Sequence, residues 1–317
     1  MAALGGVMIG CTAEPRSDSP GPRKVRASAQ RYMGHAVAYV GVADSLFAQE
    51  NVDFEIVTAG NASEAMPLLL NGQIDVLFGS LTPGAINAMA EGQAVRIVAV
   101  RNVFDASNCA SAAVVESVAR PKPPRERPVV SVDRDLAWRY LVERTLSKAG
   151  HREDDFRWTS VPNLAEIDGL QKGTIDYALS GEPWLTRTLT AGAARQWLSM
   201  DSLLNGESYT YVLFGPRLLR EDRETGEAVM RGYLAAAARF REGKTPRNLE
   251  ILTASLGESR DLLERTCWPA VSLDGQLRSA DIMAFQEWAL AHKYIKRMAS
   301  IADVWDSSFV TSAARTP

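Results

Sequence analysis

Strand-like and helix-like patterns of hydrophobic residues alternate along the chain from residue 24 onwards. Short alternating or wholly apolar runs predict strands, and apolar residues spaced three or four apart predict helices. The strand patterns cover residues 24–30, 52–58, 74–78, 95–100, 129–132, 156–161 and 175–179, and the helical patterns cover 36–50, 62–70, 83–90, 136–149, 164–171 and the run that ends at 190. Such alternation is typical of βαβ units and mostly parallel sheets, so we predict an α/β protein.

The second series of these elements repeats the first. The segment NGQID, with Gly72 and Asp75, lies between a helix and a strand of the first series, and KGTID, with Gly173 and Asp176, lies at the same place in the second. A repeat of this length indicates two lobes of similar architecture. The extended segments 110–116 and 208–214 flank the second series. We expect them to be hinge strands that join two doubly wound lobes.

These patterns divide the chain into four parts. Residues 24–108 form the predicted lobe one, and residues 109–214 hold the hinge strands and lobe two. Residues 215–317 are mainly helical, and we expect them to return to lobe one and end in C-terminal helices. Residues 1–23 have a different character.

An apolar start and a polar continuation distinguish this N-terminal part. Residues 1–10 are apolar, Cys11 follows at once, and residues 12–23 are rich in Pro, Ser and Gly. An apolar stretch that ends in a small residue before Cys is typical of a bacterial lipoprotein signal, although the usual positively charged start is missing. We therefore expect Cys11 to carry lipid and the segment after it to act as a tether. The alternative is an uncleaved apolar start with an incidental cysteine.

Charge and composition narrow the class of protein. The 317 residues carry a net charge of −3, which argues against nucleic-acid binding. No apolar run reaches the roughly 18–20 residues that span a bilayer. The three cysteines, Cys11, Cys109 and Cys267, are too few for a disulfide framework, and no spacing typical of zinc ligands occurs. We expect Cys109 and Cys267 to be buried or free thiols, although an extracytoplasmic site would permit a disulfide between them. We expect no metal and no cofactor.

Four short motifs together resemble one family of proteins. They are the segment from Gly34-His35-Ala36 to VDFEI at 52–56, LNGQID at 70–75 with Gly79-Ser80, GEPW at 181–184, and VWDSSFV at 304–310. Their order and spacing resemble the solute-binding proteins of bacterial importers for nitrate, sulfonates, taurine and thiamine-pyrimidine precursors. The resemblance implies a bilobal type II periplasmic-binding-protein fold that closes around a small solute. It does not identify the solute.

Candidate ligand-binding residues follow from the position of loops in α/β sheets. Ligands lie outside the carboxyl ends of the strands, where loops lead into helices. In lobe one this rule selects Tyr32, His35, Asn61, Ser80 and Thr82. The ring and hydroxyl of Tyr32 suit an aromatic or amphipathic solute, and His35 either bonds to the ligand or is satisfied by backbone. Ser80 and Thr82 precede a helix N-terminus, which binds anions, or they only cap that helix.

In lobe two the same reasoning selects Arg134, Asp135, Glu182 and Trp184, and the expected return hinge adds Tyr209. Arg134 fits an anionic group or pairs with its flanking aspartates, of which Asp135 is a natural helix cap. Glu182 fits a ligand with N–H donors, and Trp184 either stacks on that ligand or packs between the lobes. Tyr209 is expected to face the cleft. The mixed set favours a small aromatic or heterocyclic solute.

The resemblance and these residues predict a transport receptor. Such a protein is an extracytoplasmic, lipid-anchored monomer that captures a small solute and delivers it to a membrane permease with its ATPase. No motif typical of nucleophilic or phosphate-binding enzymes occurs. Two alternatives remain: a biosynthetic enzyme on the same fold, of the pyrimidine or menaquinone pathway type, and a ligand-sensing module.

Overall fold

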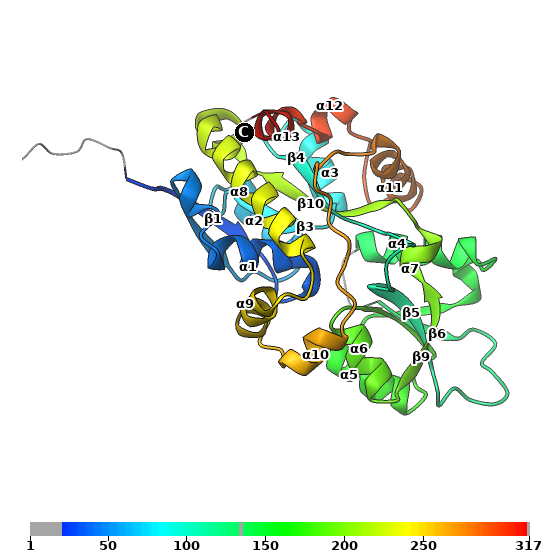
Figure 1. Cartoon of the computed structure of the whole chain (residues 1–317). Helices are drawn as coiled ribbons and strands as arrows, with labels where there is room; N and C mark the ends of the chain where they lie inside the picture. The colour runs from blue at the N-terminus through cyan, green and yellow to red at the C-terminus, as the bar shows by residue number, and fades with distance from the viewer. Residues whose placement is uncertain (1–20, 133–135, 316–317) are drawn as a thin grey trace, which may run out of the picture.

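The chain forms two α/β lobes that lie side by side, each built around one five-stranded sheet (Figure 1). We describe residues 21–132 and 136–315 in a computed structural model. Sheet one has the order β2-β1-β3-β10-β4, with β1 (Arg23–Ser28), β2 (Val52–Val57), β3 (Val76–Gly79), β4 (Arg96–Val103) and β10 (Ser208–Phe214). Sheet two has the order β7-β6-β8-β5-β9, with β5 (Ala112–Ser117), β6 (Val129–Ser131), β7 (Arg157–Thr159), β8 (Tyr177–Gly181) and β9 (Ala194–Ser199). The predicted bilobal α/β fold is confirmed.

The two sheets have the same topology. In sheet one, β1 runs parallel to β2 and β3, whereas β10 runs antiparallel between β3 and β4. In sheet two, β6 runs parallel to β7 and β8, whereas β5 runs antiparallel between β8 and β9. The segments 110–116 and 208–214, which were expected to be hinge strands, include β5 and β10, inner strands with a hydrogen-bonded neighbour on each side. The chain crosses between lobes just before them, at residues 104–111 and after α7 (Met200–Leu203).

Helices cover both faces of each sheet. Lobe one carries α1 (Ala36–Ala43), α2 (Ala62–Leu70), α3 (Pro83–Ala90), α8 (Arg223–Arg241), α9 (Pro246–Leu256), α12 (Ile301–Val304) and α13 (Ser308–Ala313). Lobe two carries α4 (Leu136–Lys148), α5 (Asn163–Gln171), α6 (Trp184–Thr190) and α7. The helices α10 (Arg260–Arg265) and α11 (Ser279–Ala291) lie where the C-terminal part meets lobe two, α10 against α6 and α11 against α4.

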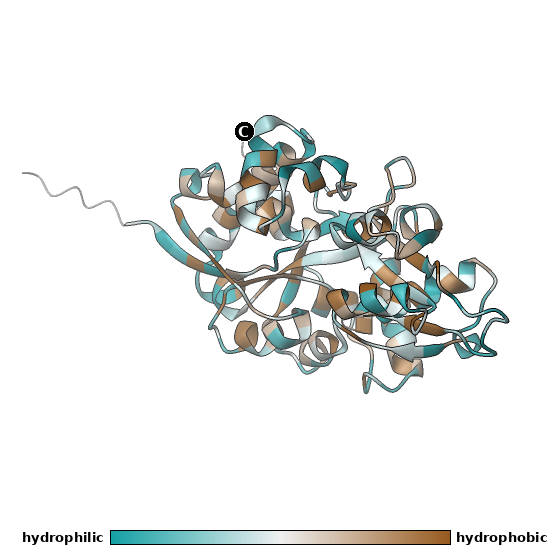
Figure 2. Ribbon diagram, turned by 90° about the horizontal axis from the view of Figure 1, so that it is seen from below, coloured by the Kyte–Doolittle hydropathy of each residue, from teal (hydrophilic) through white to brown (hydrophobic). Residues whose placement is uncertain are grey.

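Hydrophobic burial holds each lobe together. One core packs α1, α8 and α13 against sheet one, and a second core runs from α2 and α3 through the lobe contact to α4 and α11. Figure 2 shows hydrophobic segments along the strands and hydrophilic ones on many outer turns. In the described residues, no helix is long and apolar enough to cross a bilayer.

The repeated aspartates, Asp75 and Asp176, make the same hydrogen bonds to a neighbouring strand in both lobes. The Asp75 N–H donates to Arg26 O at 2.7 Å, and its carboxylate accepts from Arg26 N at 2.9 Å. Asp176 makes the matching pair with Val129, at 3.0 and 2.7 Å. Gly72 and Gly173 both have φ of +68°, a left-handed conformation that favours glycine. The predicted internal repeat is confirmed, since each copy fastens its turn to the neighbouring strand.

A third segment, residues 266–278, crosses from α10 to α11 between the lobes (orange in Figure 1). It is fastened by a disulfide between Cys109 and Cys267, so the expectation of two free thiols is wrong. The two cysteines are 158 positions apart in sequence, and only the fold brings the first crossing and the third crossing together. The disulfide thus links the first crossing between the lobes, residues 104–111, to the third, residues 266–278.

We predict that removing this disulfide lowers stability. A long closed loop restricts the unfolded chain, so the variant Cys109→Ser/Cys267→Ser should lose about 2–4 kcal/mol in free energy of unfolding. Urea denaturation of the oxidised wild type and the variant measures the difference. A reductant should shift the wild type towards the variant and leave the variant unchanged. Equal urea midpoints for the oxidised wild type and the double variant would show that the disulfide contributes nothing to stability.

Candidate functional site

A cavity of about 310 Å³ lies between the two lobes. It lies at the carboxyl ends of the parallel strands, the position that α/β sheets offer to ligands. Six residues that the sequence selected line it: Tyr32, His35, Asn61 and Ser80 from lobe one, Glu182 from lobe two, and Tyr209 from β10. The volume suits a small organic molecule.

Arg101 is the principal charged group of this cavity. Its side chain is 1% exposed, and no carboxylate of the described residues forms an ion pair with it. Nη1 lies 3.2 Å from Nδ1 of His35 and Nε donates to Oδ1 of Asn102 at 3.3 Å, so both nitrogens meet neutral partners. A buried guanidinium with this surrounding offers its remaining N–H groups and its charge to an anion.

A β-bulge aims Arg101 at the cavity. In the β4–β10 pairing, Val100 faces Tyr211 and Asn102 faces Thr210, so Arg101 is the extra residue between them. Bulges of this kind redirect a side chain and occur often beside active sites. The bulge therefore accounts for the direction of a buried charged side chain within an otherwise mostly apolar strand.

Burial makes the Arg101 charge costly. It lowers the pKa of Arg101 to about 10, so the guanidinium remains charged at neutral pH. A base whose pKa is lower in the folded state than in the unfolded state destabilises the fold wherever the unfolded group is charged. The cost here is about 3 kcal/mol. A bound anion would offset this cost.

His35 is held in one neutral tautomer. Its Nδ1 receives the backbone N–H of Gln30 at 3.2 Å and faces Nη1 of Arg101. Both partners are donors, so Nδ1 must accept and Nε2 must carry the proton. His35 therefore helps to orient Arg101.

Aromatic rings form the apolar part of the cavity. Trp138 on α4 contacts the ring of Tyr209 edge-on at 5.5 Å, and Tyr209 stacks on Phe104 at 4.2 Å. On the other lobe, the Tyr32 hydroxyl accepts a hydrogen bond from Asn163 of α5 at 2.8 Å. This bond joins the lobes at the cavity, so Tyr32 also contributes to closure.

Glu182 lines the cavity, but protein donors occupy its carboxylate. Oε1 accepts from Thr186 Oγ1 at 2.8 Å and from Cys267 N at 2.9 Å, and Oε2 accepts from Thr186 N at 3.0 Å. Burial raises the pKa of Glu182. The carboxylate thus caps α6 and fastens the third interlobe segment. A ligand N–H donor would have to compete with these bonds.

The other candidates lie in several places. Thr82 is 1% exposed and accepts from Ala85 N at 3.2 Å, and it is not among the residues that line the cavity. Asn61 lines the cavity, but its side-chain oxygen caps α2 through Ser63 N and Glu64 N. Trp184 lies outside the lining, 4.9 Å from the guanidinium of Arg187. The alternative in which Thr82 caps its own helix matches its contact with Ala85. The ligand-binding roles of Asn61 and Trp184 stay predictions.

Three predicted residues lie outside the described part of the chain: Cys11, Arg134 and Asp135. Their roles stay predictions.

The sequence analysis missed Arg101 and Trp138. Arg101 directly follows the apolar run 95–100, so the strand-end rule used for the first three strands also selects it. Trp138 lies within a helix whose inward face was not assigned to the cleft.

Solved structures share this fold. The ligand-binding component of an ABC-type import system from Staphylococcus aureus is 14% identical, with a TM-score of 0.75 over 93% of this chain and 100% of that one. The periplasmic aliphatic sulphonate-binding protein SsuA from Escherichia coli is 15% identical, with a TM-score of 0.71 over 92% and 99%. The desulfurization enzyme DSZB is 11% identical, with a TM-score of 0.67 over 92% and 99%. The same fold therefore serves binding proteins and at least one enzyme.

Sequence comparison gives the family. No curated protein matches the chain, but the model of the NMT1-like family matches residues 18–254. The match includes both sheets, the Gly-Asp repeats and Arg101, and it covers well over half of the chain. The protein therefore belongs to the NMT1-like family.

Proposed function

We propose that the protein is the extracytoplasmic solute-binding component of an ABC-type importer, and that its solute is a small organic anion. The observation that carries the proposal is the buried Arg101 guanidinium, which lines the interlobe cavity and forms no ion pair with a carboxylate of residues 21–132 or 136–315. The sulphonate-binding protein of the same fold supports the anionic class.

The cavity favours an organic anion over an inorganic one. Its lining combines the Arg101 guanidinium with the rings of Trp138 and Tyr209. A solute with an anionic head and an apolar or aromatic body would use both kinds of group. This revises the heterocyclic solute expected from the sequence, because the charge of Glu182 is directed to Thr186 and Cys267.

Transport roles follow from the proposal. Closure of two lobes around a solute is a hinge motion that a permease and its ATPase can recognise. The disulfide supports an extracytoplasmic site, because such bonds persist in oxidising compartments. We retain the proposals that the protein is a monomer and that Cys11 anchors it to the membrane by lipid.

We predict that Arg101→Met abolishes most anion affinity. A charge-assisted hydrogen bond contributes about 1.5–3 kcal/mol, so affinity should fall about 10- to 100-fold. A thermal-shift screen of alkyl and aryl sulfonates, carboxylates and nitrate first identifies a ligand, and calorimetric titration then compares the variants.

Arg96→Met is the matched control, because Arg96 lies on the same strand but not at the cavity. It should keep the wild-type affinity. Ligand-free Arg101→Met should be at least as stable as the wild type, since it removes a buried charge that no carboxylate in the described part of the chain compensates. Undiminished affinity in Arg101→Met would refute the proposed site. Mass spectrometry of the recovered ligand distinguishes a binder, which returns it unchanged, from an enzyme.

Glu182→Gln should affect stability more than anion affinity. The amide replaces one acceptor oxygen by a donor, which then faces the N–H of either Thr186 or Cys267, and this should cost about 1–3 kcal/mol in free energy of unfolding. Urea denaturation measures this loss, and the exposed Glu91→Gln is the control. A variant that is as stable as the wild type but has lost affinity would instead place Glu182 in the ligand site.

Cys11→Ser should release the protein from membranes. A bacterial lipoprotein cysteine carries several acyl chains, which suffices for stable anchoring. When the chain is expressed in a bacterium with a complete signal region, the wild type should sediment with membranes and the variant should remain in the soluble fraction. A wild type that stays in the cytosol would contradict the anchoring proposal.

A further inference from the structure

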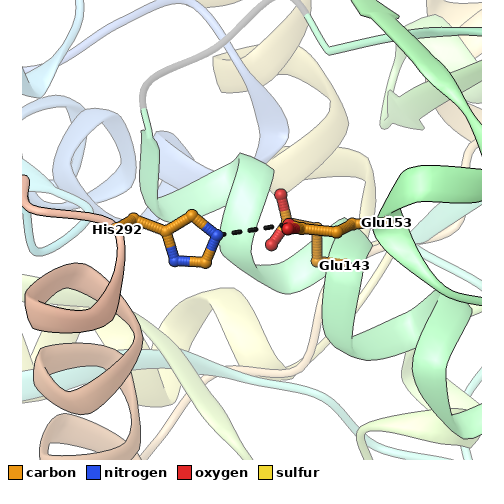
Figure 3. Close-up of side chains that lie close together, drawn as sticks. All are labelled: Glu143, Glu153 and His292. Atoms are coloured by element: carbon orange, nitrogen blue, oxygen red, sulfur yellow. Dashed lines mark hydrogen bonds and ion pairs between the residues drawn. The ribbon is translucent and has the colours of Figure 1, made fainter.

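A cluster of three metal-ligating side chains lies at the lobe contact, outside the cavity. Glu143 lies on α4, Glu153 opens the short helix Glu153–Asp155, and His292 directly follows α11. One ligand atom from each side chain lies within 4.8 Å of the other two. Figure 3 shows the three side chains pointing towards one another. Sequence spacing gives no hint of this cluster, because the fold alone joins its members.

A backbone carbonyl determines which ring nitrogen of His292 carries a proton. Nδ1 of His292 lies 2.9 Å from the Trp288 carbonyl oxygen, which can only accept, so Nδ1 is the donor. In the neutral ring Nε2 then carries a lone pair, and it lies 3.2 Å from Oε2 of Glu153. A lone pair and a carboxylate oxygen repel each other unless a proton or a cation lies between them. Metal-binding histidines commonly donate their other N–H to a backbone carbonyl in this way.

The carboxylates are also held in place. Glu143 is paired with Arg139 and accepts the indole N–H of Trp288 at 2.6 Å. Arg139 offsets one of the two negative charges, so the cluster still has a net charge of about −1 with neutral His292. The side chains of Glu153 and His292 are 42% and 29% exposed, which leaves a path for an ion and for a water ligand.

We propose that Glu143, Glu153 and His292 bind a divalent transition-metal ion of the zinc class. Zinc binds histidine nitrogen and carboxylate oxygen at about 2.0–2.2 Å, which places neighbouring ligands of a tetrahedron about 3.4 Å apart. The observed 3.2 Å between His292 and Glu153 is close to that separation. Magnesium and calcium prefer sites made of oxygen only. Water would supply the fourth ligand, as in open zinc sites.

The ion would join the two lobes. Glu143 and Glu153 belong to lobe two, whereas the helix before His292 is fastened to lobe one. Asp281 of α11 accepts from the N–H and hydroxyl of Ser208 at the start of β10, at 2.9 and 2.8 Å, and Arg297 donates to Ala90 of α3. A bound metal would therefore favour one arrangement of the lobes, and by reciprocity the solute and the metal would influence each other's affinity.

Calorimetric titration of the untagged full chain, stripped with a chelator, tests the site with zinc chloride and with magnesium chloride. We expect one zinc ion per chain and much weaker magnesium binding. His292→Ala and Glu153→Gln should each weaken zinc binding by more than about 10-fold, because even partners outside the ligand set change metal affinity by that much. Trp288 contacts both His292 and Glu143, so its fluorescence should change on zinc addition.

Asp154→Asn is the matched control, since it removes an exposed charge from the same short helix without touching the cluster. It should bind zinc like the wild type. Circular dichroism confirms that each variant is folded, and Glu153→Gln, at a largely exposed position, provides a second test if His292→Ala unfolds. No saturable zinc binding by the wild type, or unchanged affinity in a folded Glu153→Gln or His292→Ala, would overturn the proposal.

Discussion

The buried charge of Arg101 is the constraint on which the account of the cleft depends. A guanidinium that is removed from water requires a counter-charge or a set of acceptors, and within the described residues its hydrogen-bond partners are the neutral side chains of His35 and Asn102. The bulge in β4 places that charge between the lobes, where two sheets direct their strand ends at one cavity. An anion that entered this cavity would gain a strong partner and would relieve a destabilising charge at once. Under the proposed function, this one interaction would support both the affinity for an anion and the closure of the lobes.

The duplicated architecture explains why the cavity lies between two walls of the same kind. Asp75 and Asp176 fasten equivalent turns to equivalent strands, so β3 and β8 end at corresponding places in their sheets. The inner antiparallel strands β5 and β10 each follow a crossing from the other lobe. Contacts from the third segment, through Cys267 to both Cys109 and Glu182, then couple the crossings to the wall of the cavity. Motion of one lobe is thus linked to the environment of the bound solute.

Sequence patterns predicted most of the fold because hydrophobic periodicity and helix caps are local features of the chain. The helices at 62–70 and 83–90 have the predicted bounds, since Asn61 and Thr82 cap them as their side chains allow. The strand β9 was missed because its residues alternate weakly and carry Arg195 and Gln196. The inner position of β5 and β10 was also missed, since extended apolar character does not reveal whether a strand connects or pairs. Long-range pairings such as Cys109–Cys267 leave no local signal.

For the site, the strand-end rule selected Tyr32, His35 and Ser80, which line the cavity, and the expected return hinge supplied Tyr209. The sequence did not show that protein donors occupy the Glu182 carboxylate, or that β4 continues past Val100 and includes Arg101. A crystal structure of the protein with an organosulfonate from the screen tests the central claim most directly. The account predicts that oxygens of the sulfonate lie within hydrogen-bonding distance of the Arg101 guanidinium, with the organic body against Trp138 and Tyr209. A sulfonate bound away from Arg101, or an Arg101 paired with a protein carboxylate, would contradict it.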